Sequence, residues 1–462
     1  MKVTIDGWAW INKQDLPEPK IQNLRDRLTL TPYRYQEGDR GGEPTETLRL
    51  YEETETRLGM AREFYMGFRR PDHEVELRTT LGDRSSWPGP LVWNPEVELR
   101  PGQREGLAAI LSHFQTRLGG MAKAKPGFGK TILALAVAHA LQVPTLVFVQ
   151  KDFLLHQWME RIFGNPKKEH RPVFLNAQVG IVKGGRCEFD GKHIVIASMQ
   201  SLARRDGFLQ ADYPAAFYQW PGLVVTDEAH HVGAQTWTGL APRFPAHHRL
   251  GITATPKRKD RLERAFFEHI GPIVFESKVP TLPFKVKRVW TEWGLPRGER
   301  VPQSLVGRNI LIDYMIRDKK RNELIVQVLG DAVRSGRSVV LLSERREHLE
   351  TLAMIFRERN PGVDYGFHVG GLTQEERDEV ETKRVMFATY QNVAEAFDCP
   401  HLDTAFFCTP CSDPEQPVGR IQREHPSKKP PIVVDFRDDN VRRFKDLGER
   451  RERFYVDEGA LS

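Results

Sequence analysis

The sequence predicts an α/β protein with two units of parallel sheet that follow a small α+β module. From residue 96 onward, apolar β-branched runs alternate with helical segments, which indicates strands that helices cover on both faces. A proline-containing segment at 276–284 interrupts this alternation, which then resumes. A chain of 462 residues is long enough for about three domains. We therefore expect domains at 1–95, 96–278 and 279–462.

Residues 1–95 consist of short mixed stretches with turn signals at 37–44 and 87–90. They carry 14 Lys and Arg against 16 Asp and Glu, whereas the whole chain has a net charge of +6. A nucleic-acid track set by bulk charge is therefore expected in the remainder, which carries +8. The module would either read the shape of a nucleic-acid branch or dock on the first unit. Its tryptophans are expected to fill a small core rather than to stack on bases: Trp8, Trp10, Trp87 and Trp93.

The two α/β units are defined by their apolar runs, which we take in chain order. In the first unit we expect a helix at 131–141 and buried strands at 145–150, 193–198 and 222–228. In the second unit we expect strands at 338–343, 385–390, 404–409 and 431–436. Helices are expected there at 321–336, closed by Gly336, and at 347–360.

The composition excludes several classes of protein. No run approaches the roughly 18 consecutive apolar residues that a membrane span needs, and the N-terminus does not resemble a secretory signal. We therefore expect a cytoplasmic protein, by default a monomer, with protein partners unknown. Cys408 and Cys411 form a C-x-x-C, but the other two cysteines supply no second pair at matching spacing, so a zinc site is not expected.

The strongest local signal is the segment from Ala124 to Thr131, AKPGFGKT. It matches the phosphate-binding loop G-x-x-x-x-G-K-[ST] with Ala124 in place of the first glycine. Gly127 and Gly129 would let backbone N–H groups approach a polyphosphate at the start of a helix. Lys130 would place a charge on the β- and γ-phosphates, and the Thr131 hydroxyl would face Mg²⁺.

A second signal is the pair Asp227 and Glu228, which follows an apolar strand 97 residues after Lys130. Asp227 would hold Mg²⁺ through water, and Glu228 would orient and deprotonate the attacking water. The two histidines that follow lack a third ligand at suitable spacing, so we do not expect a metal site built on them.

Two further segments carry candidate residues. Thr253 and Thr255 lie two positions apart after a short strand, where their hydroxyls would bond the carboxylates and relay the nucleotide state. Arg420 and Arg423 are spaced to share one helical face. Guanidinium groups there would stabilise charge on a transferring phosphoryl group.

These four segments, in this order, resemble superfamily 2 helicases of the DEAH/DExH kind over residues 97–462. The resemblance implies two tandem RecA-like (P-loop NTPase) domains that bind ATP and Mg²⁺ between them. It also implies that Gln103 reads the adenine edge, that Asp398 contributes to ATP binding, and that Gln416 acts in coupling. Ala396 stands where the family usually has glycine.

Within the superfamily, 250–267, 368–377 and the C-terminal tail resemble phage UvsW-type branch-migration helicases, with XPB-like repair helicases next. The implied function is an ATP-dependent helicase or translocase that remodels branched DNA, such as forks and Holliday-type junctions with single-stranded segments. Three alternatives stay open: an RNA helicase, the motor subunit of a restriction-type nuclease, and a non-catalytic binding module. DNA-backbone contacts are implied for Lys151, Gln200, Ser343 and Thr389. The basic run 317–321 is expected to be solvated surface.

Overall fold

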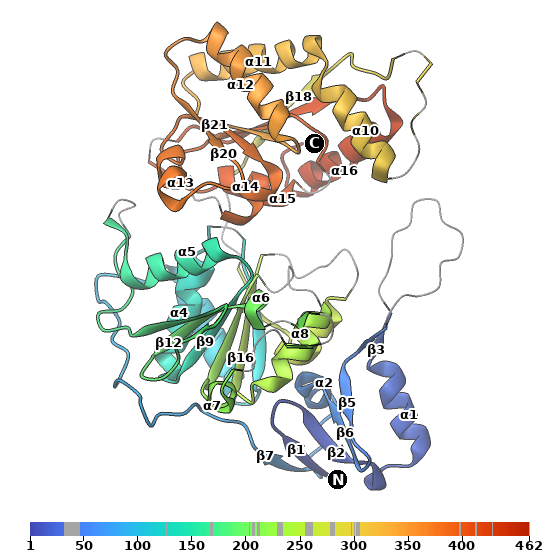
Figure 1. Cartoon of the computed structure of the whole chain (residues 1–462), viewed down its shortest axis with the longest axis vertical. Coiled ribbons are helices and arrows are strands. Elements are labelled where there is room, and N and C mark those ends of the chain that lie inside the picture. The colour runs from blue at the N-terminus through green and yellow to red at the C-terminus, as the bar shows by residue number, and fades with distance from the viewer. Residues whose placement is uncertain are drawn as a thin grey trace. The chain divides into compact units, whose positions relative to one another are not determined.

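The protein is described by a computed structural model, in which the chain divides into two compact units that meet in sequence near residue 280 (Figure 1). The described residues are 1–31, 47–125, 127–166, 170–202, 204–205, 208–209, 213–228, 234–254, 262–277, 282–296, 298–299, 301, 305–396, 399–411, 414–426 and 428–461. The first unit joins the N-terminal module to the first large sheet, and the second unit holds the second large sheet.

The first unit is built on an eight-stranded sheet with the strand order β11-β10-β12-β9-β15-β16-β8-β17. All neighbours pair in parallel except β10 and β11, which form an antiparallel hairpin. The strands in the middle of the sheet are buried along their whole length, as expected for a parallel sheet that is covered on both faces. The strands are β8 (Gly119–Lys123), β9 (Thr145–Val149), β10 (Val179–Lys183), β11 (Arg186–Cys187), β12 (Ile194–Ser198), β15 (Leu223–Asp227), β16 (His248–Thr253) and β17 (Ile273–Glu276).

Helices cover both faces of this sheet and enclose two separate apolar clusters (Figure 1). One cluster includes Leu133 of α4 and Trp158 of α5, and the other includes Trp237 of α8. The helices are α3 (Pro101–Phe114), α4 (Lys130–Leu141), α5 (Asp152–Phe163), α6 (Met199–Leu202), α7 (Ala215–Gln219), α8 (Ala234–Leu240) and α9 (Arg264–Ile270); a short hairpin joins β13 (Arg204–Arg205) to β14 (Phe208–Leu209).

The N-terminal module contains a five-stranded sheet in the order β5-β6-β2-β1-β7, in which only β1 and β7 pair in parallel. Its apolar core continues into the first large domain, because Leu118, Leu262 and Ala265 belong to the same buried cluster. The elements are β1 (Lys2–Ile5), β2 (Ala9–Asn12), α1 (Glu18–Arg27), β3 (Thr29–Leu30), β4 (Leu48–Arg49), β5 (Tyr51–Glu53), β6 (Arg57–Met60), α2 (Arg62–Met66) and β7 (Glu74–Leu77).

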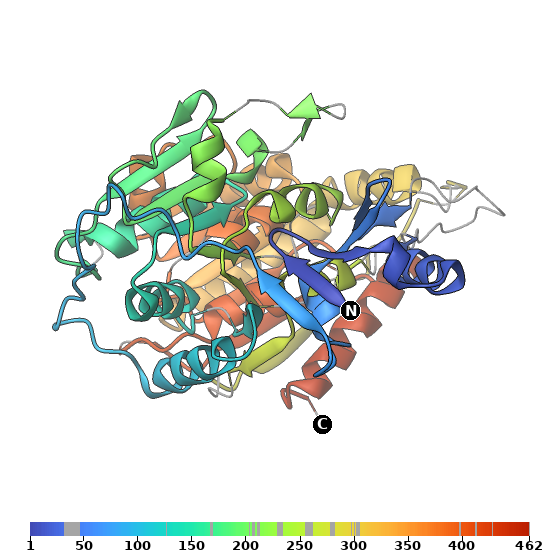
Figure 2. The same ribbon diagram turned by 90° about the horizontal axis from the view of Figure 1, so that it is seen from below.

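Two buried arginines join this module to the large sheet. Arg62 of α2 donates to the carbonyls of Ala246 and His247 at 2.7 and 2.8 Å. Arg249 of β16 donates back to the carbonyl of Gly7 at 3.1 Å. Figure 2 shows the strands of the module beside helices of the same unit. The module is therefore a fixed part of the first unit.

The second unit contains a fully parallel six-stranded sheet in the order β18-β23-β22-β19-β21-β20. Two apolar clusters again lie on its two faces. Its strands are β18 (Lys285–Trp290), β19 (Val339–Ser343), β20 (Tyr365–His368), β21 (Val385–Thr389), β22 (Thr404–Phe407) and β23 (Ile432–Arg437). Its helices are α10 (Leu305–Ile316), α11 (Lys319–Arg334), α12 (Arg346–Arg359), α13 (Gln374–Val380), α14 (Tyr390–Ala396), α15 (Glu415–Ile421) and α16 (Arg442–Asp457).

The predicted fold class is confirmed, and each strand and helix range expected in the two units overlaps an observed element. Several strands are missing from the prediction, and among them β8, between β16 and β17, begins with Gly119 and Gly120. These glycines permit a close approach, since a Cβ at Gly119 would lie 1.9 Å from the carbonyl oxygen of Ile270. The expectation that the run 317–321 is solvated is wrong for Arg321, which is buried and paired with Asp438.

Candidate active site

The phosphate-binding loop lies between the end of β8 at Lys123 and the start of α4 at Lys130. Gly127 and Gly129 have φ angles of 86° and 88°, a left-handed conformation that glycine adopts without steric cost. The backbone thus requires glycine where the sequence pattern has it. Lys130 and Thr131 occupy the first turn of α4, where unsatisfied N–H groups and the helix dipole favour an anion.

The side chain of Gln103, in α3, forms hydrogen bonds with the backbone of this loop. Its Nε2 donates to the carbonyl of Phe128 at 3.0 Å and lies 3.3 Å from that of Gly129, and its Oε1 accepts from the N–H of Arg100. The side chain is buried, so both ends of its amide are engaged within the protein. These contacts place the Gln103 side chain against the loop, and its expected role at the adenine edge stays a prediction.

The two candidate acids follow β15, which runs beside β16 and β9 in the centre of the sheet. Glu228 has a φ of 47°, an uncommon conformation for a residue with a side chain. Its Oε1 lies 2.8 Å from Nζ of Lys130, and its Oε2 accepts from the N–H of Ala254 at 3.4 Å. The structure therefore brings together Lys130 and Glu228, which are far apart in sequence.

Asp227 is buried, and its Oδ2 accepts a hydrogen bond of 2.8 Å from the indole N–H of Trp158. Burial and the neighbouring Glu228 carboxylate raise the pKa of Asp227 to about 6, while Trp158 and Lys130 oppose that shift. Two adjacent carboxylates in a buried setting favour a compensating cation. Carboxylate and hydroxyl oxygens are the ligands that Mg²⁺ prefers, so Asp227 and Thr131 fit the expected ion.

Thr253 ends β16 and is buried. Its carbonyl accepts from the N–H of Ala124, which ties this strand to the first residue of the phosphate-binding loop. The bond to Glu228 comes from the backbone of the next residue, Ala254. The predicted partner Thr255 lies outside the described residues.

Lys151 and Gln200, the two nucleic-acid candidates of the first unit, follow neighbouring strands. Lys151 precedes α5 after β9 ends, and Gln200 lies in α6 directly after β12. Since β9 and β12 are parallel neighbours, their carboxyl ends meet at the same edge of the sheet. Gln200 is exposed and Lys151 is half-buried.

In the second unit, Ser343 and Thr389 are register partners at the ends of β19 and β21. Thr389 is half-buried, whereas Ser343 is 0% exposed. The hydroxyl of Ser343 lies 3.0 Å from Nδ1 of His348 and accepts from the N–H of Arg345. The Ser343 side chain thus faces the protein here, and its contact with DNA stays a prediction.

Arg420 and Gln416 lie on α15 and are half-buried. The helix ends at Ile421, so Arg423 lies beyond it, and the expected shared helical face is not observed. The carbonyl of Arg423 is held by Nζ of Lys428 at 2.7 Å. Asp398 lies outside the described residues.

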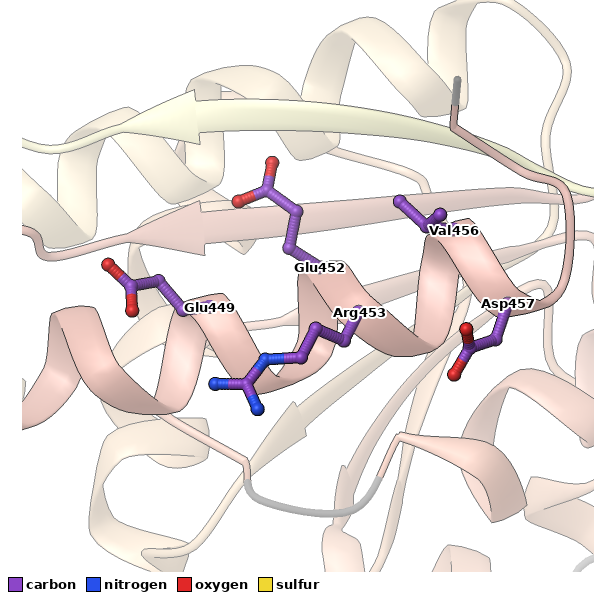
Figure 3. A pocket seen from close by; sticks show the side chains of 5 residues that line it. All are labelled: Glu449, Glu452, Arg453, Val456 and Asp457. Atoms are coloured by element: carbon purple, nitrogen blue, oxygen red, sulfur yellow. The ribbon is translucent and has the colours of Figure 1, made fainter.

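A shallow hollow of about 420 Å³ lies along α16 in the second unit (Figure 3). Its lining residues all come from one helix and mix acids with a base, and Glu452 among them is already paired with Arg288 and Arg437. This hollow therefore offers no convergent set of groups for a phosphate.

The described parts of the chain hold no group of three potential metal ligands among His, Cys, Asp and Glu. Nor do they include a helix with the length and apolar character to cross a membrane.

The segment that carries this site is similar to known proteins. Residues 96–258, which contain the phosphate-binding loop and both acids, match the family model of the type III restriction enzyme res subunit. The chain is 24% identical to a mimivirus protein named for ATP-dependent RNA helicase activity, over 98% of this chain and 85% of that one. It is 29% identical to the DNA 3'-5' translocase XPB2 of Sulfurisphaera tokodaii, over 47% and 45%. The proteins to which this chain is similar are superfamily 2 helicases. Helicases of this kind are driven by ATP hydrolysis.

Two solved structures are similar to this chain. A fragment assigned as the HsdR subunit of a type I restriction enzyme from Vibrio vulnificus gives a TM-score of 0.53 at 16% identity, over 78% of this chain and 67% of that one. The UvsW protein of phage T4 gives a TM-score of 0.41 at 13% identity, over 99% and 98%. The likeness to the HsdR fragment supports the fold described above.

Two contacts at this site are not predicted from the sequence. The first is Trp158, which bonds Asp227 across 69 positions of sequence. The only local signal for it is the apolar face of α5, where Leu155, Trp158 and Ile162 recur at helical spacing. The second is the contact of Gln103 with the loop, which requires knowledge of how α3 packs against α4.

Proposed function

We propose that this protein is an ATP-driven DNA translocase that remodels branched DNA, such as forks and Holliday-type junctions. The observation that carries the ATPase part is the convergence of Lys130, Asp227 and Glu228 at one edge of the sheet, with Lys130 and Glu228 in direct contact. The similarity to the XPB2 translocase supports the proposal that the protein moves along DNA. The preference for branches rests on the sequence resemblance to UvsW-type helicases.

In this proposal, different groups of the chain bind the phosphates, activate the attacking water and hold the metal ion. N–H groups of the loop and the first turn of α4 hold the phosphates, and Lys130 neutralises their charge. Glu228 orients and deprotonates the attacking water. Bound at Asp227 and Thr131, Mg²⁺ would supply charge compensation for the phosphate oxygens. Arg420 and Arg423 of the second unit would stabilise the transferring phosphoryl group.

The nucleic-acid track would be held through its phosphates, which carry no sequence information and so allow uniform affinity along a strand. The proposed contacts are Lys151, Gln200 and Thr389. Gln416, Thr253 and Thr255 would couple the nucleotide state to this track, and Asp398 would complete the ATP site. We propose this division of roles for domains at 96–278 and 279–462.

A second candidate function is an RNA helicase. It is favoured by the mimivirus relative, which is named for activity on RNA and matches almost the whole chain. The motor subunit of a restriction-type nuclease is a third candidate, since the matching family model carries that name.

The test measures ATP hydrolysis by the full chain with forked DNA, Holliday-type junctions, linear duplex, single-stranded DNA and single-stranded RNA at one fixed salt concentration. We expect branched DNA to stimulate hydrolysis most. Stronger stimulation by RNA would replace the proposal with the RNA helicase. Equal stimulation by linear and branched duplex would favour a motor that does not recognise branches. Absence of hydrolysis with every nucleic acid would overturn the ATPase assignment.

A further inference from the structure

Asp227 is held by a side chain that belongs to another element. The indole N–H of Trp158, in α5, donates to Oδ2 of Asp227 at 2.8 Å. Trp158 is 1% exposed and Asp227 is 5% exposed, so water does not compete for this bond. A hydrogen bond to a buried charged group is stronger than one between neutral groups. The bond therefore turns Oδ2 of Asp227 toward the protein interior.

The indole ring of Trp158 is held in place by the apolar side chains around it. Trp158 packs in the same apolar cluster as Leu155, Val149 and Ile162. An indole with a locked ring plane presents its N–H in one direction only, since it has a single donor and no acceptor. The backbone N–H of Glu228 also opposes the rise in the pKa of Asp227. Since Oδ2 is turned toward Trp158, we expect a metal ion to approach Oδ1.

The same helix reaches the proposed nucleic-acid track. Lys151 is the residue that precedes α5, and Trp158 lies seven positions later, or about 10 Å along the helix axis. Asp152, the first residue of the helix, is paired with Lys183 at 2.9 Å at the carboxyl end of β10. A displacement of α5 at its start would therefore be transmitted by a rigid element to the indole that holds Asp227.

We infer that Trp158 is a positioning residue, which orients Asp227 for Mg²⁺ and links it to the segment proposed to contact nucleic acid. This inference rests on the proposed function and deepens it, because it names the connection between the two sites. Groups that orient metal-binding carboxylates typically change metal affinity by about 10- to 100-fold when they are removed. The effect of losing Trp158 should therefore appear in the Mg²⁺ dependence before it appears in folding.

The chain offers a matched control in Trp237. It is also fully buried in the first unit, but its indole nitrogen has no acceptor among the residues that the structure describes. Trp158→Phe and Trp237→Phe thus remove the same volume, and only the first removes a hydrogen bond. The measured quantity is the equilibrium affinity for a fluorescent, non-hydrolysable ATP analogue as Mg²⁺ is varied, together with the thermal unfolding temperature.

We expect Trp158→Phe to raise the Mg²⁺ concentration for half-maximal binding about tenfold, whereas Trp237→Phe matches wild type. Affinity with the metal chelated should be the same in all three proteins. Equal Mg²⁺ dependence in both variants would overturn the role of Trp158 and leave the proposed function standing. Wild-type protein without Mg²⁺-dependent nucleotide binding would instead overturn the proposed function.

A second measurement covers the case in which Trp158→Phe does not fold. Wild-type protein labelled with ¹⁵N in its nine tryptophans gives one indole N–H signal for each. The Trp158 signal is identified through Asp227→Asn, which should displace it most because the acceptor changes. We expect Mg²⁺ with the ATP analogue to shift this signal and to leave that of Trp237 in place. An unmoved Trp158 signal in protein that has bound the analogue would overturn the inference.

Discussion

Lys130 and Glu228 form a direct ion pair, with 2.8 Å between Nζ and Oε1. We propose that the lysine binds the phosphates and that the glutamate activates the attacking water. Oε2 of Glu228 also accepts a hydrogen bond from the backbone N–H of Ala254, the residue that follows β16. The carboxylate therefore links the phosphate-binding loop to the end of β16. A nucleotide that takes Lys130 as its partner must therefore replace this ion pair.

Glu228→Gln should separate binding from hydrolysis. Loss of the general base should lower the hydrolysis rate by about 10²- to 10⁴-fold. Nucleotide binding should become tighter, because a neutral side chain competes less with phosphate for Lys130. Single-turnover hydrolysis and equilibrium binding of a fluorescent analogue measure the two effects. Glu276→Gln, which alters an ion pair with Lys123 in the same unit, should change neither. A normal hydrolysis rate in Glu228→Gln would remove its base role.

Lys130→Ala should abolish ATP turnover. It removes the charge expected to face the phosphates and leaves Glu228 without its cationic partner. The matched control is Lys123→Ala, which removes a lysine from the end of β8 whose partner Glu276 is exposed. Exposed pairs of this kind contribute little to stability, about 0–1 kcal/mol, so the control should keep turnover. Steady-state phosphate release measures both variants, and unchanged turnover in Lys130→Ala would exclude it from the site.

Much of the fold and of the ATP site could be predicted from the sequence because the signals are local. Apolar runs of strand length indicate buried parallel strands. The phosphate-binding loop motif predicts the positions of the glycines and of Lys130. Contacts between distant segments leave no such pattern. Trp158 has the appearance of an ordinary core residue of α5, and its bond to Asp227 depends on how α5 packs against the sheet.

Charged and polar residues are the other source of difference between prediction and structure, since sequence patterns treat them as surface. Arg321 is buried in the second unit because its guanidinium pairs with Asp438 and donates to the carbonyl of Cys408. Ser343 similarly turns inward to His348. Arg423 fails for a different reason, because the helix ends before it and helical spacing no longer applies. Each of these outcomes is decided by a tertiary partner or a helix end.

Deletion of residues 1–95 should destabilise the first unit rather than produce a working motor with altered substrate choice. The deletion uncovers Leu118 and Ala265 and takes the Gly7 carbonyl away from buried Arg249. Arg62→Leu is a milder probe, because it leaves the carbonyls of Ala246 and His247 without their donor. Unsatisfied buried acceptors typically cost about 1–3 kcal/mol each. Chemical denaturation measures the loss, and a truncated chain as stable as the full chain would contradict the shared core.

Glu63 should make the stability of the first unit depend on pH. The residue is buried at the junction of the module, where Arg62, Arg249 and Arg117 face it and Arg117 lies 3.8 Å away. Burial nevertheless dominates and raises its pKa to about 7. The folded state therefore binds a proton more tightly than the unfolded state, whose carboxyl has its ordinary value of 4.5. Stability from this group is present below pH 4.5 and is lost as the pH rises toward 7.

Glu63→Gln removes the ionisation and should abolish this dependence. The shift corresponds to about 3 kcal/mol at most, so the variant should be more stable than wild type by up to that amount at pH 8. The two proteins should converge below pH 4.5, the ordinary pKa of the unfolded carboxyl. Urea denaturation across this range measures the difference, with Glu74→Gln as a control at an exposed position of β7. A variant less stable than wild type at pH 8 would show that Glu63 is ionised there and that its attraction to the arginines outweighs the cost of burial.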